Sequence, residues 1–172
     1  MRAGYVAVGI AAVVAIFVLL LAASNYANAS LQYRSRGAQG YDFSKSSTNV
    51  AMDVCNPTPF PASFDRLQFV ATYKDSNLAT IKFENGSIPA NAATTVEGAL
   101  QVNGRGALAA VFQSFADSLN GKSTGDASMN VKMTSESWLL GLVPVSQSKE
   151  MSGDEFSQMM SGKSGFSCPT KS

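Results

Sequence analysis

STNVAMDVCNPTPFPASFDRLQFVATY, residues 47–73, is the stretch that decides the fold. Apolar side chains occupy every second position on both sides of its centre: Val50, Met52 and Val54 before it, and Leu67, Phe69, Ala71 and Tyr73 after it. A period of two is typical of strands with one buried face. The prolines at 57, 59 and 61 lack an N–H and fix φ, so neither a helix nor a central strand continues through them. The stretch therefore predicts two antiparallel strands joined at a corner.

The corner itself consists of Cys55, Asn56 and Pro57. Pro57 ends the first strand, and the side chain of Asn56 can hydrogen-bond neighbouring backbone groups. We therefore assign Asn56 and Pro57 a role in folding rather than in chemistry. The alternation places Cys55 on the face opposite Val54, pointing away from the predicted core.

Other segments with a period of two are expected to lie beside this pair as further strands, separated by polar turns. The strands are Leu31 to Arg36 at a sheet edge, Ala79 to Glu84, Val96 to Val102, Met129 to Glu136 and Trp138 to Val145, with turns at Lys74 to Asn77 and Asn85 to Asn91. Short alternating strands of this kind predict an antiparallel β-sandwich over residues 30–151.

Between Gly104 and Asn120 the apolar period changes to 3.6, which predicts one helix. The segment opens with Gly104-Arg105-Gly106-Ala107-Leu108-Ala109, which matches the G-x-G-x-x-A dinucleotide fingerprint and has Asp126 downstream. That fingerprint needs a buried parallel sheet, whereas the neighbouring strands alternate polar and apolar residues. We interpret the glycines as a turn from strand to helix.

The first 29 residues form a separate segment. Tyr5 to Ala23 is apolar and uncharged, and at about 1.5 Å per residue it nearly spans a hydrocarbon core about 30 Å thick. It predicts an uncleaved single-pass transmembrane anchor, with cleavage after Ala29 as the alternative. The uncharged spacer from Ser24 to Gln32 favours an extracytoplasmic domain, although a cytoplasmic one remains open. At the other end, residues 152–172 are rich in Gly and Ser and predict a loosely packed tail.

The two cysteines, Cys55 and Cys168, do not have the spacing of metal ligands. A disulfide between them would tie the tail to the corner, and an oxidising compartment outside the cytoplasm would preserve it. Two unpaired thiols are the alternative.

Composition excludes several classes of function. Only 15% of the residues are charged and the net charge is +1, without a cluster of Lys and Arg, so nucleic acid is not an expected partner. The chain has no histidine, which excludes Ser-His-Asp triads and Cys-His dyads. Its carboxylates are scattered. We expect no enzyme, no cofactor and no metal site.

The apolar run from Trp138 to Val143 has three interpretations, which the sequence leaves open. It can be a core strand, a contact with a membrane surface, or a surface for a protein partner. In the last case the side chains that make the contact would be those of Trp138, Leu140 and Leu142.

Taken together, Val50 to Pro57, the hairpin from Leu67 to Phe83, the Ile88-Pro89-Ala90 turn, the strand from Val96 to Val102 and the helix resemble the group 2 late embryogenesis abundant family, also called the water stress and hypersensitive response domain. The resemblance implies an immunoglobulin-like or fibronectin-like sandwich with one helix, often behind a single membrane anchor. Lys82-Phe83-Glu84 and the tail with Cys168 depart from the family pattern.

These observations lead to two functional hypotheses. The first is a non-catalytic, membrane-anchored and outward-facing domain with a structural, stress-protective or protein-binding role, which meets other proteins through its sheet edges. The second is a carrier or accessory subunit for a small apolar ligand. Its pocket would be lined by Phe83, Phe112, Phe115, Met129 and Met133.

Overall fold

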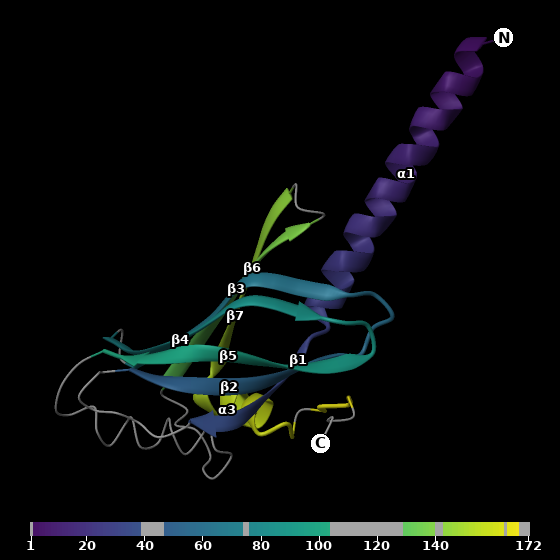
Figure 1. Cartoon of the computed structure of the whole chain (residues 1–172). Coiled ribbons are helices and arrows are strands. Elements are labelled where there is room, and N and C mark those ends of the chain that lie inside the picture. Colours follow the sequence, from purple (N-terminus) through teal and green to yellow (C-terminus); the bar gives the residue numbers. More distant parts are fainter. Residues whose placement is uncertain are drawn as a thin grey trace.

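The structure is a computed structural model, in which helix α1 extends away from a β-sheet domain (Figure 1). It describes residues 2–38, 47–73, 76–103, 129–139, 143–163 and 165–168, with side chains from residue 14 onward except at 38, 76 and 139. The predicted helix from Gly104 to Asn120 and its glycine motif lie outside these residues.

The described residues form two helices and seven strands. These are α1 (Arg2–Ala29), β1 (Gln32–Ala38), β2 (Ser47–Asn56), β3 (Ala62–Tyr73), β4 (Ser76–Ile88), β5 (Ala92–Val102), β6 (Met129–Leu139), β7 (Val143–Ser152) and α3 (Gly153–Met160). The expectation of a mainly β protein behind an N-terminal helix is confirmed. Trp138 to Val145, predicted as one strand, instead spans the end of β6 and the start of β7, where Trp138 pairs with Pro144.

All seven strands belong to one antiparallel sheet with the order β1-β2-β5-β4-β3-β6-β7. The corner at Pro57 carries the chain from β2 to β3, which are not neighbours in the sheet, since β5 and β4 lie between them. A division into the two separate sheets of a sandwich is not shown, because the ladder of pairs is continuous from β1 to β7.

The sheet curls around a core centred on Phe69 of β3. Tyr33 of β1 packs edge-on against this ring at 6.1 Å between centroids, and Phe83 of β4 does so at 6.4 Å. Strand β1 stands four places from β3 in the sheet order, so this contact requires the sheet to fold back on itself. The apolar alternation predicted for β3 is confirmed, because Leu67, Phe69 and Ala71 are buried.

Helix α3 closes the curled sheet, so the prediction of a loosely packed tail from residue 152 is wrong. Phe156 is fully buried and lies 5.7 Å from the Phe69 ring, and Met160 is buried beside it. A capping box starts the helix: Ser152 accepts from the Glu155 N–H, and the Glu155 carboxylate accepts from the Ser152 N–H. Glycine and serine suggested a tail, but the S-x-x-E pattern is a helix start.

Strand β4 extends to Ile88, so the turn predicted from Asn85 onward is shorter than expected. Gly86 lies under the ring of Phe64 in β3, and a Cβ there would stand 2.2 Å from a ring atom. Asn85 has a positive φ of 55° yet does not end the pairing of β3 with β4. Asn and Gly are therefore used here for close packing within a strand, and the turn begins only at Pro89.

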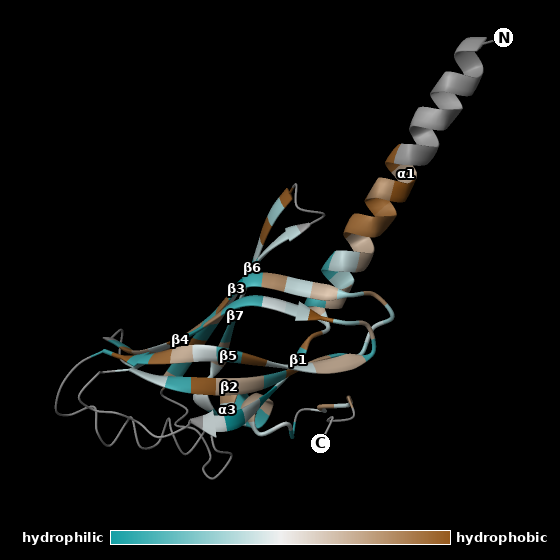
Figure 2. Cartoon of the chain, in the orientation of Figure 1, coloured by the Kyte–Doolittle hydropathy of each residue, from teal (hydrophilic) through white to brown (hydrophobic). Residues whose placement is uncertain are grey.

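Helix α1 carries exposed apolar side chains from Val14 to Leu20 (Figure 2). Within the described residues, no helix is both long enough and apolar enough to cross a membrane. Part of the predicted span, Tyr5 to Val13, lies outside the residues with described side chains.

Phe156→Ala is expected to lower the free energy of unfolding by about 3–5 kcal/mol, because it leaves a cavity beside Phe69. Gln158→Ala, on the exposed side of the same helix, should change it by less than about 0.5 kcal/mol. Urea titration of the full chain followed by circular dichroism measures both values. Equal values would show that α3 does not support the core.

Candidate functional site

The side chain of Asn56 is fully buried and bridges two loops. Its Nδ2 donates to the carbonyl oxygens of Phe60 (2.7 Å), Pro89 (3.2 Å) and Ile88 (3.4 Å). Its Oδ1 accepts from the N–H (3.1 Å) and the hydroxyl (2.8 Å) of Thr58. One amide thus holds the corner after β2 against the turn between β4 and β5. This is the folding role that the sequence suggested for Asn56.

The structure brings Cys55 and Cys168 to disulfide distance, with their Cα atoms 5.6 Å apart. Cys55 lies outside the apolar core cluster that contains Val54. It is nevertheless fully buried. Gln32, its partner in β1, accepts hydrogen bonds from the N–H (2.8 Å) and hydroxyl (3.1 Å) of Ser167. The C-terminal segment, residues 165–168, therefore covers the side of the sheet toward which Cys55 points.

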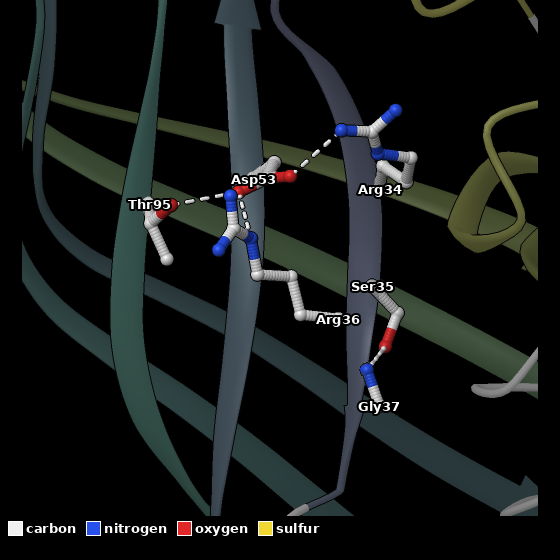
Figure 3. Close-up of polar contacts among 6 residues, drawn as sticks. All are labelled: Arg34, Ser35, Arg36, Gly37, Asp53 and Thr95. Atoms are coloured by element: carbon white, nitrogen blue, oxygen red, sulfur yellow. Dashed lines mark hydrogen bonds and ion pairs between the residues drawn. The ribbon is translucent and has the colours of Figure 1, made fainter. Parts of the chain in front are cut away.

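A second cluster on this face joins β1, β2 and β5 around Asp53 (Figure 3). Its carboxylate accepts from Arg34 (2.8 Å), Arg36 (2.7 Å) and the hydroxyl of Thr95 (2.8 Å). Burial by itself raises the pKa of Asp53. The hydrogen bonds from Arg34, Thr95 and Arg36 outweigh that effect and hold the pKa below its usual value.

This Asp53 cluster has a structural role, since the carboxylate is buried and three of its about four acceptor sites are taken by side chains of the neighbouring strands. The guanidinium of Arg34 also lies 4.3 Å from the centroid of the Phe166 ring. Arg34 thereby links Asp53 to the C-terminal segment. Sequence reasoning missed the cluster, although Arg34 and Arg36 share one face of their strand and Asp53 faces the same way in the next.

A groove of about 460 Å³ lies where the two edges of the curled sheet approach each other. Its walls come from the junction of α1 and β1 (residues 28, 29 and 31–33), from β6 (Met133 and Ser135), from β7 (residues 147–149 and 151) and from α3 (Glu155, Gln158 and Met159). The groove therefore combines three methionines with amide and hydroxyl groups.

Of the residues that the sequence predicts to line a ligand pocket, only some lie at this groove. Met133 does line the groove. Phe83 and Met129 are instead buried in the general core, because their strands place them on the packed face of the sheet. Phe112 and Phe115 lie outside the described residues. The sequence identified apolar side chains correctly but did not separate core from groove.

The predicted partner surface is described only in part. Trp138 is 53% exposed, so it is not a core residue, and Val143 on the facing strand is 39% exposed. Leu140 and Leu142 lie outside the described residues.

No family model and no curated protein matches the sequence. Two solved structures are similar at 12% identity. A protein from Archaeoglobus fulgidus aligns with a TM-score of 0.38 over 72% of this chain and 94% of its own. A protein assigned to the late embryogenesis abundant (LEA) group aligns with a TM-score of 0.26 over 81% of this chain and 84% of its own. Likenesses at this level do not establish the family.

Asn56→Ala should lower the free energy of unfolding by about 2–4 kcal/mol, because it leaves several buried carbonyl groups and the Thr58 N–H without their partner. Asn103→Ala is the control, since Asn103 is exposed and bonds only Asn77 through its side chain among the contacts described. Thermal and urea unfolding measure the difference. If both variants unfold like the wild type, the corner does not support the fold.

Asp53→Asn should lower stability at pH 7 by about 1–3 kcal/mol, because the two arginines lose an anionic acceptor. A lowered folded-state pKa stabilises the protein above the unfolded value, and this contribution is lost as pH falls through the folded value. The gap between variant and wild type should therefore be smaller at a pH well below the unfolded value of about 3.9 than at pH 7. Urea titrations at both pH values test this, and an unchanged gap would contradict it.

Proposed function

We propose that this chain is a non-catalytic, membrane-anchored domain that faces away from the cytoplasm and binds other proteins through the open edge of its sheet. The observation that carries the proposal is strand β7. It is the last strand of the sheet, pairs only with β6 among the described strands, and lies beside the groove.

The edge of β7 suits strand addition. Ser146, Ser148, Lys149 and Glu150 are exposed, so the outer backbone groups of this stretch are accessible to an extended segment of a partner. The neighbouring groove offers Met133, Met151 and Met159, whose flexible thioether side chains adapt to different apolar groups. An extended peptide with some apolar side chains matches this combination.

Anchoring is supported by α1 and by its junction with the domain. The apolar side chains from Val14 to Leu20 are exposed, as expected for a helix surrounded by lipid. At the other end, Ala27 is fully buried, and Asn28 accepts a hydrogen bond from the Ser63 N–H (3.1 Å). Cleavage after Ala29 would remove these contacts, which favours a retained helix.

The position outside the cytoplasm is supported by the disulfide-distance pair Cys55 and Cys168, because such bonds persist in oxidising compartments. A structural or stress-protective role follows only from the resemblance of the sequence to group 2 late embryogenesis abundant proteins. The contact of Tyr33 with Phe69 across the curled sheet is compatible with the immunoglobulin-like or fibronectin-like sandwich of that family.

The second candidate function is that of a carrier for a small apolar ligand. The groove volume of about 460 Å³ favours it, since ligand pockets are commonly about 300–1,000 Å³. The two candidate functions differ in what occupies the groove: an extended segment of a partner protein in the first, and a small apolar molecule in the second.

A photo-crosslinking residue in place of Ser148 should capture a protein in native membranes, because this position lies on the free edge of β7. The same residue in place of Glu97, exposed on the interior strand β5, which is paired on both sides, is the matched control and should capture none. Gel shift and mass spectrometry identify the adducts. Uncrosslinked monomer at both positions would overturn protein binding.

Native mass spectrometry of the same preparation tests the carrier. A small molecule that co-purifies with the wild type and is absent from Ser135→Phe, which fills the groove, would favour the second function.

A further inference from the structure

The hairpin of β6 and β7 ends in an apolar, uncharged tip. Trp138 pairs with Pro144 near this end, and Trp138 and Val143 are exposed. The sequence contains no charged residue from Ser137 to Ser148. Figure 1 shows the hairpin extending beyond the body of the sheet, and in Figure 2 apolar colour lies near its end.

The base of this hairpin is joined to the end of α1. Asn28 donates from Nδ2 to the hydroxyl oxygen of Ser137 (3.3 Å), the residue before Trp138. The same Asn28 side chain accepts from the Ser63 N–H on β3. In Figure 1 the helix and the hairpin leave the sheet on the same side. Helix α1 and the hairpin of β6 and β7 therefore both leave the sheet near the contact of Asn28 with Ser137.

The reach of the two elements from that point is similar. Going back along α1 from Asn28, the helix arrives at Ala23, where its apolar run ends, after about 7.5 Å at about 1.5 Å per residue. Going forward along β6 from Ser137, the strand arrives at Leu139 after about 6.6 Å at about 3.3 Å per residue. The strand thus reaches Leu139, one residue beyond Trp138, over about the same length of backbone as the helix needs to reach its apolar run.

We propose that the tip of the hairpin, at Trp138 and Val143, is a second contact with the bilayer that holds α1. The inference rests on the proposed membrane anchor. Tryptophan favours the boundary between headgroups and acyl chains, because its ring is apolar and its N–H can still hydrogen-bond. A lipid surface also suits a tip without charges, since no charged group has to lose its water. Two contacts hold the domain in one orientation on the membrane.

Trp138 is the only tryptophan of the chain, so its fluorescence reports this site alone. The full-length protein is reconstituted in phosphatidylcholine vesicles. We expect emission shifted to shorter wavelength than in the urea-unfolded chain, loss of intensity when the acyl chains are brominated, and reduced quenching by aqueous acrylamide.

The matched control carries Trp138→Phe together with Asn130→Trp. Asn130 is exposed at the opposite end of β6, about 26 Å away at about 3.3 Å per residue. Its tryptophan should emit as in water and respond to acrylamide but not to brominated lipid. Val143→Asp in the wild-type background should reduce the bromine quenching of Trp138 while the protein still floats with the vesicles.

The outcomes separate the two proposals. Protein that floats with the vesicles but shows water-like Trp138 emission overturns the hairpin contact and leaves the anchor standing. Protein that does not float overturns the anchor and the hairpin contact with it. A shifted emission without bromine quenching means that a protein surface covers Trp138, and it overturns the lipid contact.

Discussion

The edge-on contact between Tyr33 and Phe69 is the constraint on which the other features depend. It joins the first strand of the sheet to the fifth in the sheet order, so it sets the curl. Burial raises the pKa of Tyr33, which keeps its phenol neutral in this position. Once the sheet is curled, its two edges approach each other, α3 fills the space between them with Phe156, and a groove remains beside that helix.

The two edge strands of the sheet, β1 and β7, differ in the side-chain contacts that hold them to the rest of the domain. Strand β1 is fastened by the Asp53 ion pairs, by the hydrogen bonds of Gln32 with Ser167 and by the contact of Arg34 with Phe166. Strand β7 is held to α3 at its end, where Ser152 exchanges hydrogen bonds with Glu155, whereas along Val143 to Glu150 the described residues show one long ion pair, between Lys132 and Glu150 at 4.0 Å, in addition to the pairing with β6. A free edge next to a fastened one gives a partner strand one place to add, and this asymmetry is why we assign binding to β7.

Much of the β architecture was predictable from local pattern. Alternation in β2 and β3 and the proline corner between them depend on neighbouring residues, and Asn56 was assigned to folding because its side chain can satisfy nearby backbone. The curl, the groove and the Asp53 cluster were not predictable, because they depend on which strands meet in space. Asp53 and Arg34 are far apart in sequence, and only the pairing of β1 with β2 brings them together. The capping box at Ser152 was a local signal that composition concealed.

The junction of α1 with the sheet determines how the proposed anchor could act on the domain. A flexible spacer would let the domain turn freely, whereas here Ala27 and Leu31 belong to the core cluster and Asn28 bonds to both β3 and β6. The direction of the helix is therefore coupled to that of the sheet. A helix held by lipid would then hold the hairpin tip at a fixed height, because Asn28 near the end of the helix bonds to Ser137 at the base of the hairpin. If α1 is the membrane anchor that we propose, an apolar tip beside it is consistent with a membrane surface as the contact of that tip.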